Sequence, residues 1–179
     1  MNIVITDLKD CMDMADAVRQ LYIDAFPPEE RRPWDKFKEL LESEPSFDVH
    51  VVTADGAFAG FISIWSLRDV CYGEHFATLP SLRGAGIGGA VLDEILKQLP
   101  KPFVGEVEPP ETSDVAKRRI GFYARHGLHT FDDYDYIQPP YSPELPSVRL
   151  LLMSNDREID LDATTREIHE RVYGVCRGA

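Results

Sequence analysis

The chain has 179 residues, of which 44% are hydrophobic and 28% charged, and its formal net charge is −12. This size and composition predict a single domain over residues 1–179, large enough to bury a substantial core. The acidic balance argues against a nucleic-acid partner, which would require a basic stripe. It suits a cationic substrate, although solubility alone explains it equally well.

The sequence predicts neither a signal peptide nor a membrane span. No apolar run approaches the roughly 20 residues that cross a bilayer, and Met1 leads directly into a short alternating strand. We therefore expect a soluble cytoplasmic protein that does not act on a membrane. Cys11, Cys71 and Cys176 are widely spaced, odd in number and without a C-x-x-C pair. They indicate neither a disulfide framework nor a zinc site, and no metal is expected.

Hydrophobic periodicity in the first half of the chain predicts one strand, two helices and a pair of strands. Pro27-Pro28 ends the first helix, because proline cannot continue the hydrogen-bonding pattern. Ala54-Asp55-Gly56-Ala57 predicts a tight hairpin turn between the paired strands. The predicted elements are strand 2–6, helix 13–25, helix 33–42, strand 48–54 and strand 58–67.

The second half alternates strands with helices and ends in a helix. That last helix carries Ile168, Val172 and Val175 as apolar residues, which either cap the core or support a homodimer. Residues 155–179 are accordingly predicted to form a C-terminal helical extension. The predicted elements are strand 71–79, helix 88–98, strand 102–108, helix 114–126, strand 129–136, strand 148–154 and helix 163–174.

A glycine-rich turn joins strand 71–79 to the helix that follows it. The first turn of a helix has backbone N–H groups without a partner in the helix, and it carries a partial positive charge. Glycine lets a bulky anion approach these N–H groups, because it has no Cβ. The turn therefore predicts a site for the phosphates of a cofactor. Its candidate ligands are Arg83, Gly84, Ala85, Gly86, Ile87, Gly88 and Gly89.

Two signatures fit this turn. Gly84, Gly86 and Gly89 satisfy the dinucleotide pattern G-x-G-x-x-G, and Glu106 follows at about the distance of a ribose-binding acid. That pattern expects its glycines directly after the first strand of a βαβ unit, whereas about eighty residues precede them here, so this alternative is disfavoured. Arg83, Gly86 and Gly88 also satisfy R-x-x-G-x-G, which resembles the acyl-CoA pyrophosphate loop of the GNAT superfamily of N-acetyltransferases.

A second block supports the GNAT resemblance. The segment 119–128, which contains Phe122-Tyr123 and Gly127-Leu128, resembles the family's helix ending in F-Y-x-x-x-G-F, about 35 residues after the glycine turn. The order of elements over residues 1–154 is similar to the family's as well. Ala116 and Arg119 depart from the asparagine and alanine that many members carry near these positions, and segment 108–112 lengthens the preceding connection.

The resemblance implies an α/β (α+β) GNAT fold. Its sheet is mixed and mostly antiparallel, splayed between the fourth and fifth strands, 71–79 and 102–108, with helices on both faces. The free backbone groups at such a splay can hydrogen-bond the pantetheine amides of a cofactor in the manner of a missing strand. The implied activity is transfer of an acetyl group from acetyl-CoA to a primary amine of a small molecule or peptide, by direct attack in a ternary complex.

Aminolysis of a thioester requires a neutral amine, a polarised carbonyl and a proton for the departing thiolate. By resemblance, the backbone amides of Phe76, Ala77 and Thr78 polarise the carbonyl. Tyr123 stands where a phenol hydroxyl reaches the sulfur, and is the predicted general acid. The alternative for Tyr123 is a tyrosine whose ring fills core and whose hydroxyl meets water.

Glu74 resembles the position from which family members withdraw the amine proton, and is the first candidate for the base. Glu106 and Glu108 alternate with Val107 and so share one strand face, which makes them the other candidates. Each glutamate has the alternative of a solvated surface residue. His75 points to the strand face opposite Glu74 and is predicted to be structural.

Two segments outside the cofactor blocks, 26–34 and 134–141, resemble loops that line the acceptor side of this fold. Proline-stiffened loops with charged helix starts are the alternative explanation. A competing function is a silent acyl-CoA-binding module that regulates a partner. The residues predicted to contact the acceptor are Phe26, Arg31, Arg32, Trp34, Glu106, Glu108 and Tyr136.

Overall fold

The computed structural model describes residues 2–175. The chain divides into two compact units: the first comprises Met1–Trp65 and Gly73–Gln98, and the second Ser66–Tyr72 and Leu99–Ala179. The prediction of one domain over the whole chain stays a prediction, and the extension predicted from residue 155 lies within the second unit.

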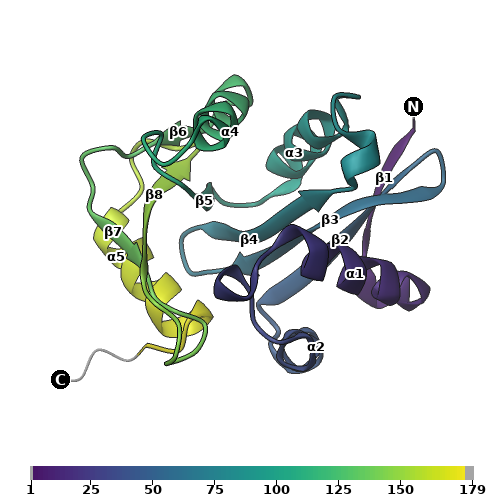
Figure 1. The fold of residues 1–179 in the computed structure, drawn as a ribbon, viewed down its shortest axis with the longest axis horizontal. Coiled ribbons are helices and arrows are strands. Elements are labelled where there is room, and N and C mark those ends of the chain that lie inside the picture. Colours follow the sequence, from purple (N-terminus) through teal and green to yellow (C-terminus); the bar gives the residue numbers. More distant parts are fainter. Residues whose placement is uncertain (1, 176–179) are drawn as a thin grey trace. The chain divides into compact units, whose positions relative to one another are not determined.

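Strands β1 to β4 are consecutive neighbours in the sheet, and both β1–β2 and β2–β3 are antiparallel (Figure 1). Asp55 and Gly56 take φ angles of 50° and 83° between the paired residues Ala54 and Ala57, which is the geometry of a primed hairpin turn. The hairpin predicted from this tetrapeptide is thus confirmed. The strands are β1 Ile3–Asp7, β2 Phe47–Ala54, β3 Ala57–Ser66 and β4 Cys71–Thr78.

Helices α1 and α2 lie on one side of the first unit's sheet, and α3 lies on the other (Figure 1). Each helix buries the apolar stripe that its sequence period predicts, for example Val18, Leu21 and Tyr22 in α1. Short 3₁₀ turns connect these elements. The helices are α1 Ala15–Ala25, α2 Trp34–Ser43 and α3 Ile87–Gln98, and the turns are η1 Leu8–Asp10, η2 Met12–Met14, η3 Pro28–Glu30 and η4 Pro80–Leu82.

Strand β8 is the centre of the second unit's sheet. Its residues Met153 and Ser154 pair with β5 on one edge and with β6 on the other, and its first residues pair with β7. Within this unit, the backbone N–H of Cys71, at the start of β4, donates to the carbonyl of Pro102 at 2.8 Å, just before β5. The strands are β5 Phe103–Val107, β6 His129–Thr130, β7 Tyr136–Gln138 and β8 Val148–Ser154.

The predicted strand 129–136 is wrong in its continuity. It is divided into β6 and β7, and the segment between them turns, with Tyr134 N–H donating to the Phe131 carbonyl at 3.2 Å. Three aspartates, Asp132, Asp133 and Asp135, crowd this segment, and their charges favour a solvated turn over a half-buried strand. The break lets Tyr136 begin a strand of its own.

Helix α4 Asp114–Arg125 begins at a Ser113 N-cap, whose hydroxyl accepts from the Ala116 N–H. The predicted helix 163–174 is instead an α-helix, α5 Leu161–Glu167, continued by the π-helix η5 Ile168–Val172. A π-turn adds a residue to the helical period, which hydrophobic spacing alone does not reveal. The predicted mixed α/β sheet with helices around it is confirmed.

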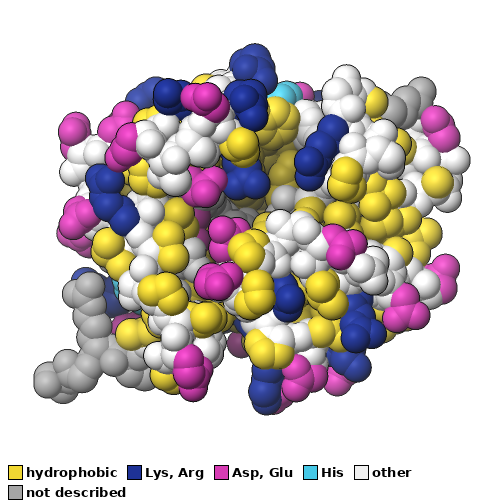
Figure 2. Space-filling model, in the orientation of Figure 1, with side chains coloured by type: hydrophobic (Ala, Val, Ile, Leu, Met, Phe, Trp, Pro, Cys, Tyr) yellow, Lys and Arg dark blue, Asp and Glu magenta, His cyan; other side chains and the backbone are white. Residues whose placement is uncertain are grey.

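Among residues 2–175, no helix is both long and apolar enough to span a bilayer. On the face shown in Figure 2, Lys and Arg side chains are interspersed with Asp and Glu and form no continuous basic stripe. Cys11 and Cys71 are free thiols in the described part of the chain, and Cys176 lies outside it.

Candidate functional site

The glycine-rich turn runs from η4 into α3 in the first unit. Ala85 N–H donates to the Leu82 carbonyl at 3.3 Å, and the first helical bond of α3 runs from Ala90 N–H to the Gly86 carbonyl at 3.1 Å. The amides of residues 87–89 precede that bond and so have no partner within the helix. They are the backbone donors that the sequence predicts for an anion.

Gly84 and Gly86 have φ angles of 83° and 76°, a region that other L-residues rarely adopt. A Cβ built on either residue meets nothing within 4 Å, so glycine is needed there for backbone conformation and not for packing. Residues 83–86 are exposed, while Ile87 is buried and fixes the helix start. The donors, the open space and Arg83 beside them fit a pyrophosphate group.

Strand β4 carries the three amides predicted to polarise a carbonyl. Leu79 N–H donates to the Ala59 carbonyl of β3 at 2.8 Å. Because amides alternate in direction along a strand, Ala77 N–H faces β3 as well, whereas Phe76 and Thr78 direct theirs away from it. A Cβ on Gly60 of β3 would clash with the Ala77 carbonyl oxygen and lie 3.0 Å from the Thr78 Cα. Gly60 thus permits the close approach that sets this end of β4.

Glu74 is held in a buried ion pair. Its Oε1 lies 2.6 Å from Arg32 Nη1, its Oε2 accepts from the indole N–H of Trp65 at 2.8 Å, and its side chain has no exposed surface. Burial alone would raise the pKa of Glu74, but the charge of Arg32, helped by His75 and these donors, lowers it below the ordinary value. Arg32 is 7% exposed, so both charges are inside the first unit.

His75 lies on the same strand with its ring fully packed. Its Nε2 is 2.9 Å from the Glu30 carbonyl oxygen, and its Nδ1 is 3.5 Å from the Ser63 hydroxyl. A carbonyl can only accept, so Nε2 carries the proton and Nδ1 faces the hydroxyl as acceptor. Burial lowers the pKa of His75, which favours this neutral form. The geometry agrees with the structural role expected from its strand face.

Tyr22 of α1 is the hub of an aromatic cluster beside this ion pair. Its hydroxyl accepts from Arg32 N–H at 3.0 Å and donates to the Arg32 carbonyl at 3.2 Å, which fixes the loop that carries the arginine. Burial, and then the charge of Glu74, raises the pKa of Tyr22 well above 10. The rings within 6.2 Å of Tyr22 are Phe26, Trp34, Phe37, Phe61 and His75.

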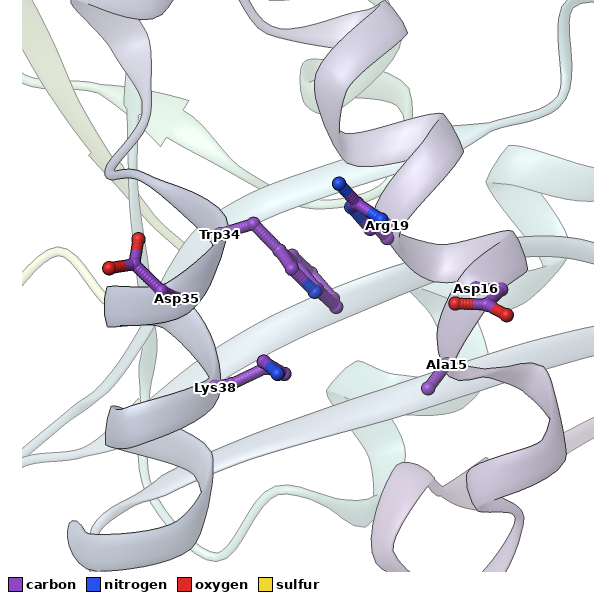
Figure 3. Close-up of a pocket in the computed structure, with 6 residues that line it drawn as sticks. All are labelled: Ala15, Asp16, Arg19, Trp34, Asp35 and Lys38. Carbon is purple, nitrogen blue, oxygen red and sulfur yellow. The ribbon is translucent and has the colours of Figure 1, made fainter.

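The aromatic residues at the two ends of the predicted acceptor segment 26–34 have different surroundings. Phe26 packs edge-on against His75 at 4.7 Å, and its carbonyl accepts from Arg31 Nε at 2.8 Å. Trp34 instead faces a pocket of about 470 Å³ between α1 and α2 (Figure 3). The pocket is lined by Ala15, Asp16, Arg19, Trp34, Asp35 and Lys38.

Glu106 and Tyr136 meet in the second unit, as their register requires. Glu106 of β5 pairs with Leu152, and Tyr136 of β7 pairs with Leu150, so all four side chains share one face of the sheet. The Tyr136 hydroxyl donates to Glu106 Oε1. Burial raises the pKa of Tyr136, and the adjoining carboxylate raises it further.

Two further tyrosines extend this cluster. Tyr173 donates to Glu106 Oε2 at 3.1 Å, and its hydroxyl lies 3.2 Å from that of Tyr72. Burial raises the pKa of Tyr173 well above 10, and Glu106 adds to the shift. No sequence motif contains both tyrosines, because Tyr72 and Tyr173 are 101 residues apart, and neither was predicted as a site residue. The hydrogen bonds of Tyr22 to Arg32 and of Trp65 to Glu74 join different elements, and no motif indicates them either.

Glu108 and Tyr123 occupy separate places in the second unit. Glu108 accepts from Arg119 of α4 at 3.1 Å in a partly exposed ion pair, a type that contributes little energy. Tyr123 lies in the last turns of α4 with its ring against Phe122. Burial raises the pKa of Tyr123, with Arg119 opposing, and among residues 2–175 its hydroxyl forms no hydrogen bond. Its proton is therefore not committed to a neighbour.

A model of the GNAT acetyltransferase family matches residues 15–128, which include both motif blocks. This chain belongs to the GNAT acetyltransferase family. The resemblance seen in the glycine turn and in the Phe-Tyr helix is confirmed. Membership of this family makes the protein an N-acetyltransferase. A search of curated protein sequences gives no significant match.

Solved structures agree with the family. A protein from Bacteroides thetaiotaomicron described as an acetyltransferase of the GNAT family is 34% identical, with a TM-score of 0.88, and the match covers 98% of this GNAT chain and 100% of the other. Arabidopsis thaliana Naa50, solved with the bisubstrate analogue CoA-Ac-MVNAL, has 16% identity and a TM-score of 0.61, over 86% of this chain and 98% of that one.

Spermidine N-acetyltransferase from Vibrio cholerae, solved with CoA and spermine, shares the fold at 12% identity and a TM-score of 0.60. That match covers 85% of this chain and 94% of the other. At these identities the Arabidopsis and Vibrio structures establish the fold alone, whereas the Bacteroides protein and the family model place the chain in the GNAT family.

Proposed function

We propose that this enzyme transfers the acetyl group of acetyl-CoA to a primary amine of a small molecule or peptide, by direct attack in a ternary complex. The observation that carries the proposal is the start of α3, where two glycines at positive φ and the unpaired amides of residues 87–89 follow Arg83. This arrangement suits a pyrophosphate, a group that acetyl-CoA contains. The CoA ligands of the Arabidopsis and Vibrio structures support the same cosubstrate.

The reaction balances without an acyl-enzyme. A base removes a proton from the ammonium form of the acceptor, and the nitrogen lone pair then forms a bond to the thioester carbon. The C–S bond breaks, its electron pair leaves with sulfur, and an acid supplies the proton that makes the free thiol. The nitrogen loses its second proton as the amide forms, and this proton restores the acid, so the net product is one proton, which the base took first. The amides of Phe76 and Thr78 are directed away from β3, and we propose them as the donors to the carbonyl oxygen. The amide of Ala77, which lies between them in sequence, faces β3.

We assign the base to Glu106 and the acid to Tyr123. Glu74 was the first candidate in the sequence, but its carboxylate is enclosed by Arg32 and Trp65, and its lowered pKa makes it a weak base. Glu106 accepts hydrogen bonds from the phenols of Tyr136 and Tyr173, which are neutral donors. The Tyr123 hydroxyl makes no hydrogen bond among residues 2–175, so its proton is available.

The acceptor is proposed to be a cationic amine, because the chain carries a net charge of −12 and the proposed base is a carboxylate. Phe26, Arg31 and Trp34 remain proposed acceptor contacts. Arg32 is proposed to act by holding Glu74 and the 26–34 loop in place. The functional test is an initial-rate assay of free thiol release over a panel of primary amines. A protein that binds CoA and releases no thiol with any amine is a silent binding module, and that result would reject the proposal.

The glycine turn gives the first prediction. Gly86→Val should weaken CoA binding at least tenfold by calorimetry, because a branched side chain would occupy the space in which phosphate approaches the amides. Gly56→Val is the matched control, since Gly56 has a similar φ of 83° and open space around it but lies in the β2–β3 turn. The control should lose similar stability and keep its CoA affinity. Equal affinity in the two variants would place the cofactor elsewhere.

Tyr123 gives the second prediction. Tyr123→Phe keeps the ring and removes the proton donor, so kcat should fall by about 10²-fold while acetyl-CoA affinity stays the same. Stopped-flow thiol release at saturating substrates measures the change. Turnover at the wild-type rate would mean that the phenol only packs and that water protonates the thiolate.

A further inference from the structure

Tyr173 reaches the proposed base from the far end of the chain. It follows the π-helix η5 and lies 67 residues beyond Glu106 in sequence, yet its hydroxyl is 3.1 Å from Glu106 Oε2. With Tyr136 on Oε1, each oxygen of the carboxylate receives a phenol donor. Two donors on the two oxygens fix the rotation of the carboxylate plane as well as its position.

The number of protons in this cluster determines which group donates in each hydrogen bond. A phenol has one proton to donate, and an ionised carboxylate only accepts. Tyr173 therefore donates its hydroxyl proton to Glu106. In the 3.2 Å contact between the hydroxyls of Tyr173 and Tyr72, the donor must then be Tyr72. The chain of donation runs from Tyr72 to Tyr173 to Glu106, and each bond polarises the next.

The segment that delivers Tyr173, here called the C-terminal arm (Leu161–Tyr173), is tied to the second unit by polar contacts along its length. The Tyr134 hydroxyl lies 3.0 Å from Thr165 Oγ1, and Glu167 accepts the backbone N–H of Arg68 at 2.9 Å. His169 Nε2 lies 3.0 Å from the Ile137 carbonyl oxygen. These contacts, with buried Ile168 and Val172, hold the π-turn whose extra residue sets the direction of Tyr173.

We propose that Tyr173 is a positioning residue for acetyl transfer, which orients Glu106 and keeps it ionised, so that the C-terminal arm is part of the catalytic apparatus and not only a cap on the core. The inference rests on the proposed function, in which Glu106 is the base. It assigns a role to the arm, for which the sequence left capping and dimer formation as alternatives.

The titratable groups around Glu106 in the second unit come from several elements. Tyr136 of β7 and Tyr173 of the arm contact the carboxylate directly. Tyr72 of β4 contacts it through Tyr173, and Tyr141 packs on the Tyr173 ring at 5.1 Å. The ring of His169 lies against Tyr136 at 5.6 Å. Any change in the pH profile must therefore be compared with variants that leave these groups in place.

The test is Tyr173→Phe, which retains the ring and its packing on Tyr141. We expect kcat to fall about tenfold, the usual scale for one hydrogen bond to a charged group, with the KM for acetyl-CoA unchanged. A carboxylate that loses a donor holds its proton more tightly, so the acid limb of the kcat–pH profile should move to higher pH by about 0.5–1 unit. A wild-type kcat and profile would overturn the proposal.

Glu167→Ala is the matched control, because it loosens the same arm at Arg68 without touching Glu106. Glu167→Ala should lower Tm and leave the acid limb of the kcat–pH profile in place. If this variant shows the same shift of the acid limb as Tyr173→Phe, the arm acts through stability alone. Glu106→Gln separates the two proposals. Wild-type turnover in Glu106→Gln would reject the base itself, whereas a slow Glu106→Gln beside an unaltered Tyr173→Phe would reject only the positioning role.

Discussion

Glu74 and Glu106 are both carboxylates that accept hydrogen bonds from aromatic side chains, but the contacts of Glu74 include an arginine and those of Glu106 include two phenols. Glu74 faces the guanidinium of Arg32 at 2.6 Å and the Trp65 indole. Glu106 faces the phenols of Tyr136 and Tyr173. A cation cancels the charge that it stabilises, whereas a neutral donor stabilises the charge and leaves it in place.

We interpret this difference as a difference in role: Glu74 stabilises the fold, and Glu106 is the proposed base. The Glu74 ion pair is fully buried, so its attraction offsets a large desolvation cost and its loss leaves a charge inside the fold. In our proposal Glu106, which accepts from two phenols, attracts the ammonium group of the acceptor and takes its proton. The comparison predicts that replacing Glu74 damages stability most, and that replacing Glu106 damages turnover most.

The largest effect is expected from Glu74→Gln, which should lower the free energy of unfolding by about 3 kcal/mol at pH 7, because the buried Arg32 loses its opposite charge. Urea denaturation measures it. Asp48→Asn is the control, since Asp48 pairs with Lys9 at 3.2 Å on the surface and should cost under about 1 kcal/mol. Equal losses in the two variants would contradict the buried-pair interpretation.

The same variant has a defined pH dependence. The pKa of Glu74 is lowered in the fold from its ordinary 4.5, so its contribution to stability is complete above pH 4.5 and is lost as pH falls through the folded-state value. The stability gap between wild type and Glu74→Gln should therefore be constant from pH 7 to 5 and narrow below 4.5. A gap that already closes near neutral pH would show that the carboxylate is not ionised in this way.

A slightly smaller free-energy change is expected from Glu106→Gln. Its kcat at neutral pH should fall about 10²-fold, equivalent to about 2.7 kcal/mol, while Glu74→Gln, corrected for its folded fraction, should stay within a few-fold of wild type. The Glu106→Gln defect should shrink as pH approaches the amine's own pKa near 10, because the acceptor then deprotonates without help. If Glu74→Gln shows that rescue instead, the base is Glu74 and our assignment is wrong.

Local chemistry made parts of this fold predictable from sequence. The β2–β3 hairpin needs only Asp55-Gly56 at positive φ, and the α3 start needs only glycines before an apolar helix. The signals for both lie within a few neighbouring residues. The break between β6 and β7 was missed because strand propensity around Tyr134 and Tyr136 outweighed the aspartates that favour a turn.

The environments of the two glutamates depend on contacts that no local pattern encodes. Arg32 reaches Glu74 from the loop before α2, and Tyr173 reaches Glu106 across 67 residues of sequence. Strand alternation predicts a common face for Glu106 and Glu108 but gives no information on their partners, and β5 ends at Val107, before Glu108. Without those partners, a glutamate in a buried ion pair and a glutamate that accepts from two phenols look the same in a sequence.

Gly60 has a consequence for anyone who maps this enzyme by saturation mutagenesis. Position 60 should tolerate glycine alone, because any side chain would push against the Ala77 carbonyl and displace the end of β4. Intolerance of this kind is commonly taken as the mark of a residue that touches substrate. Here it would report a steric constraint carried from one strand to the next, and a map of essential positions would include a residue with no side chain to contribute.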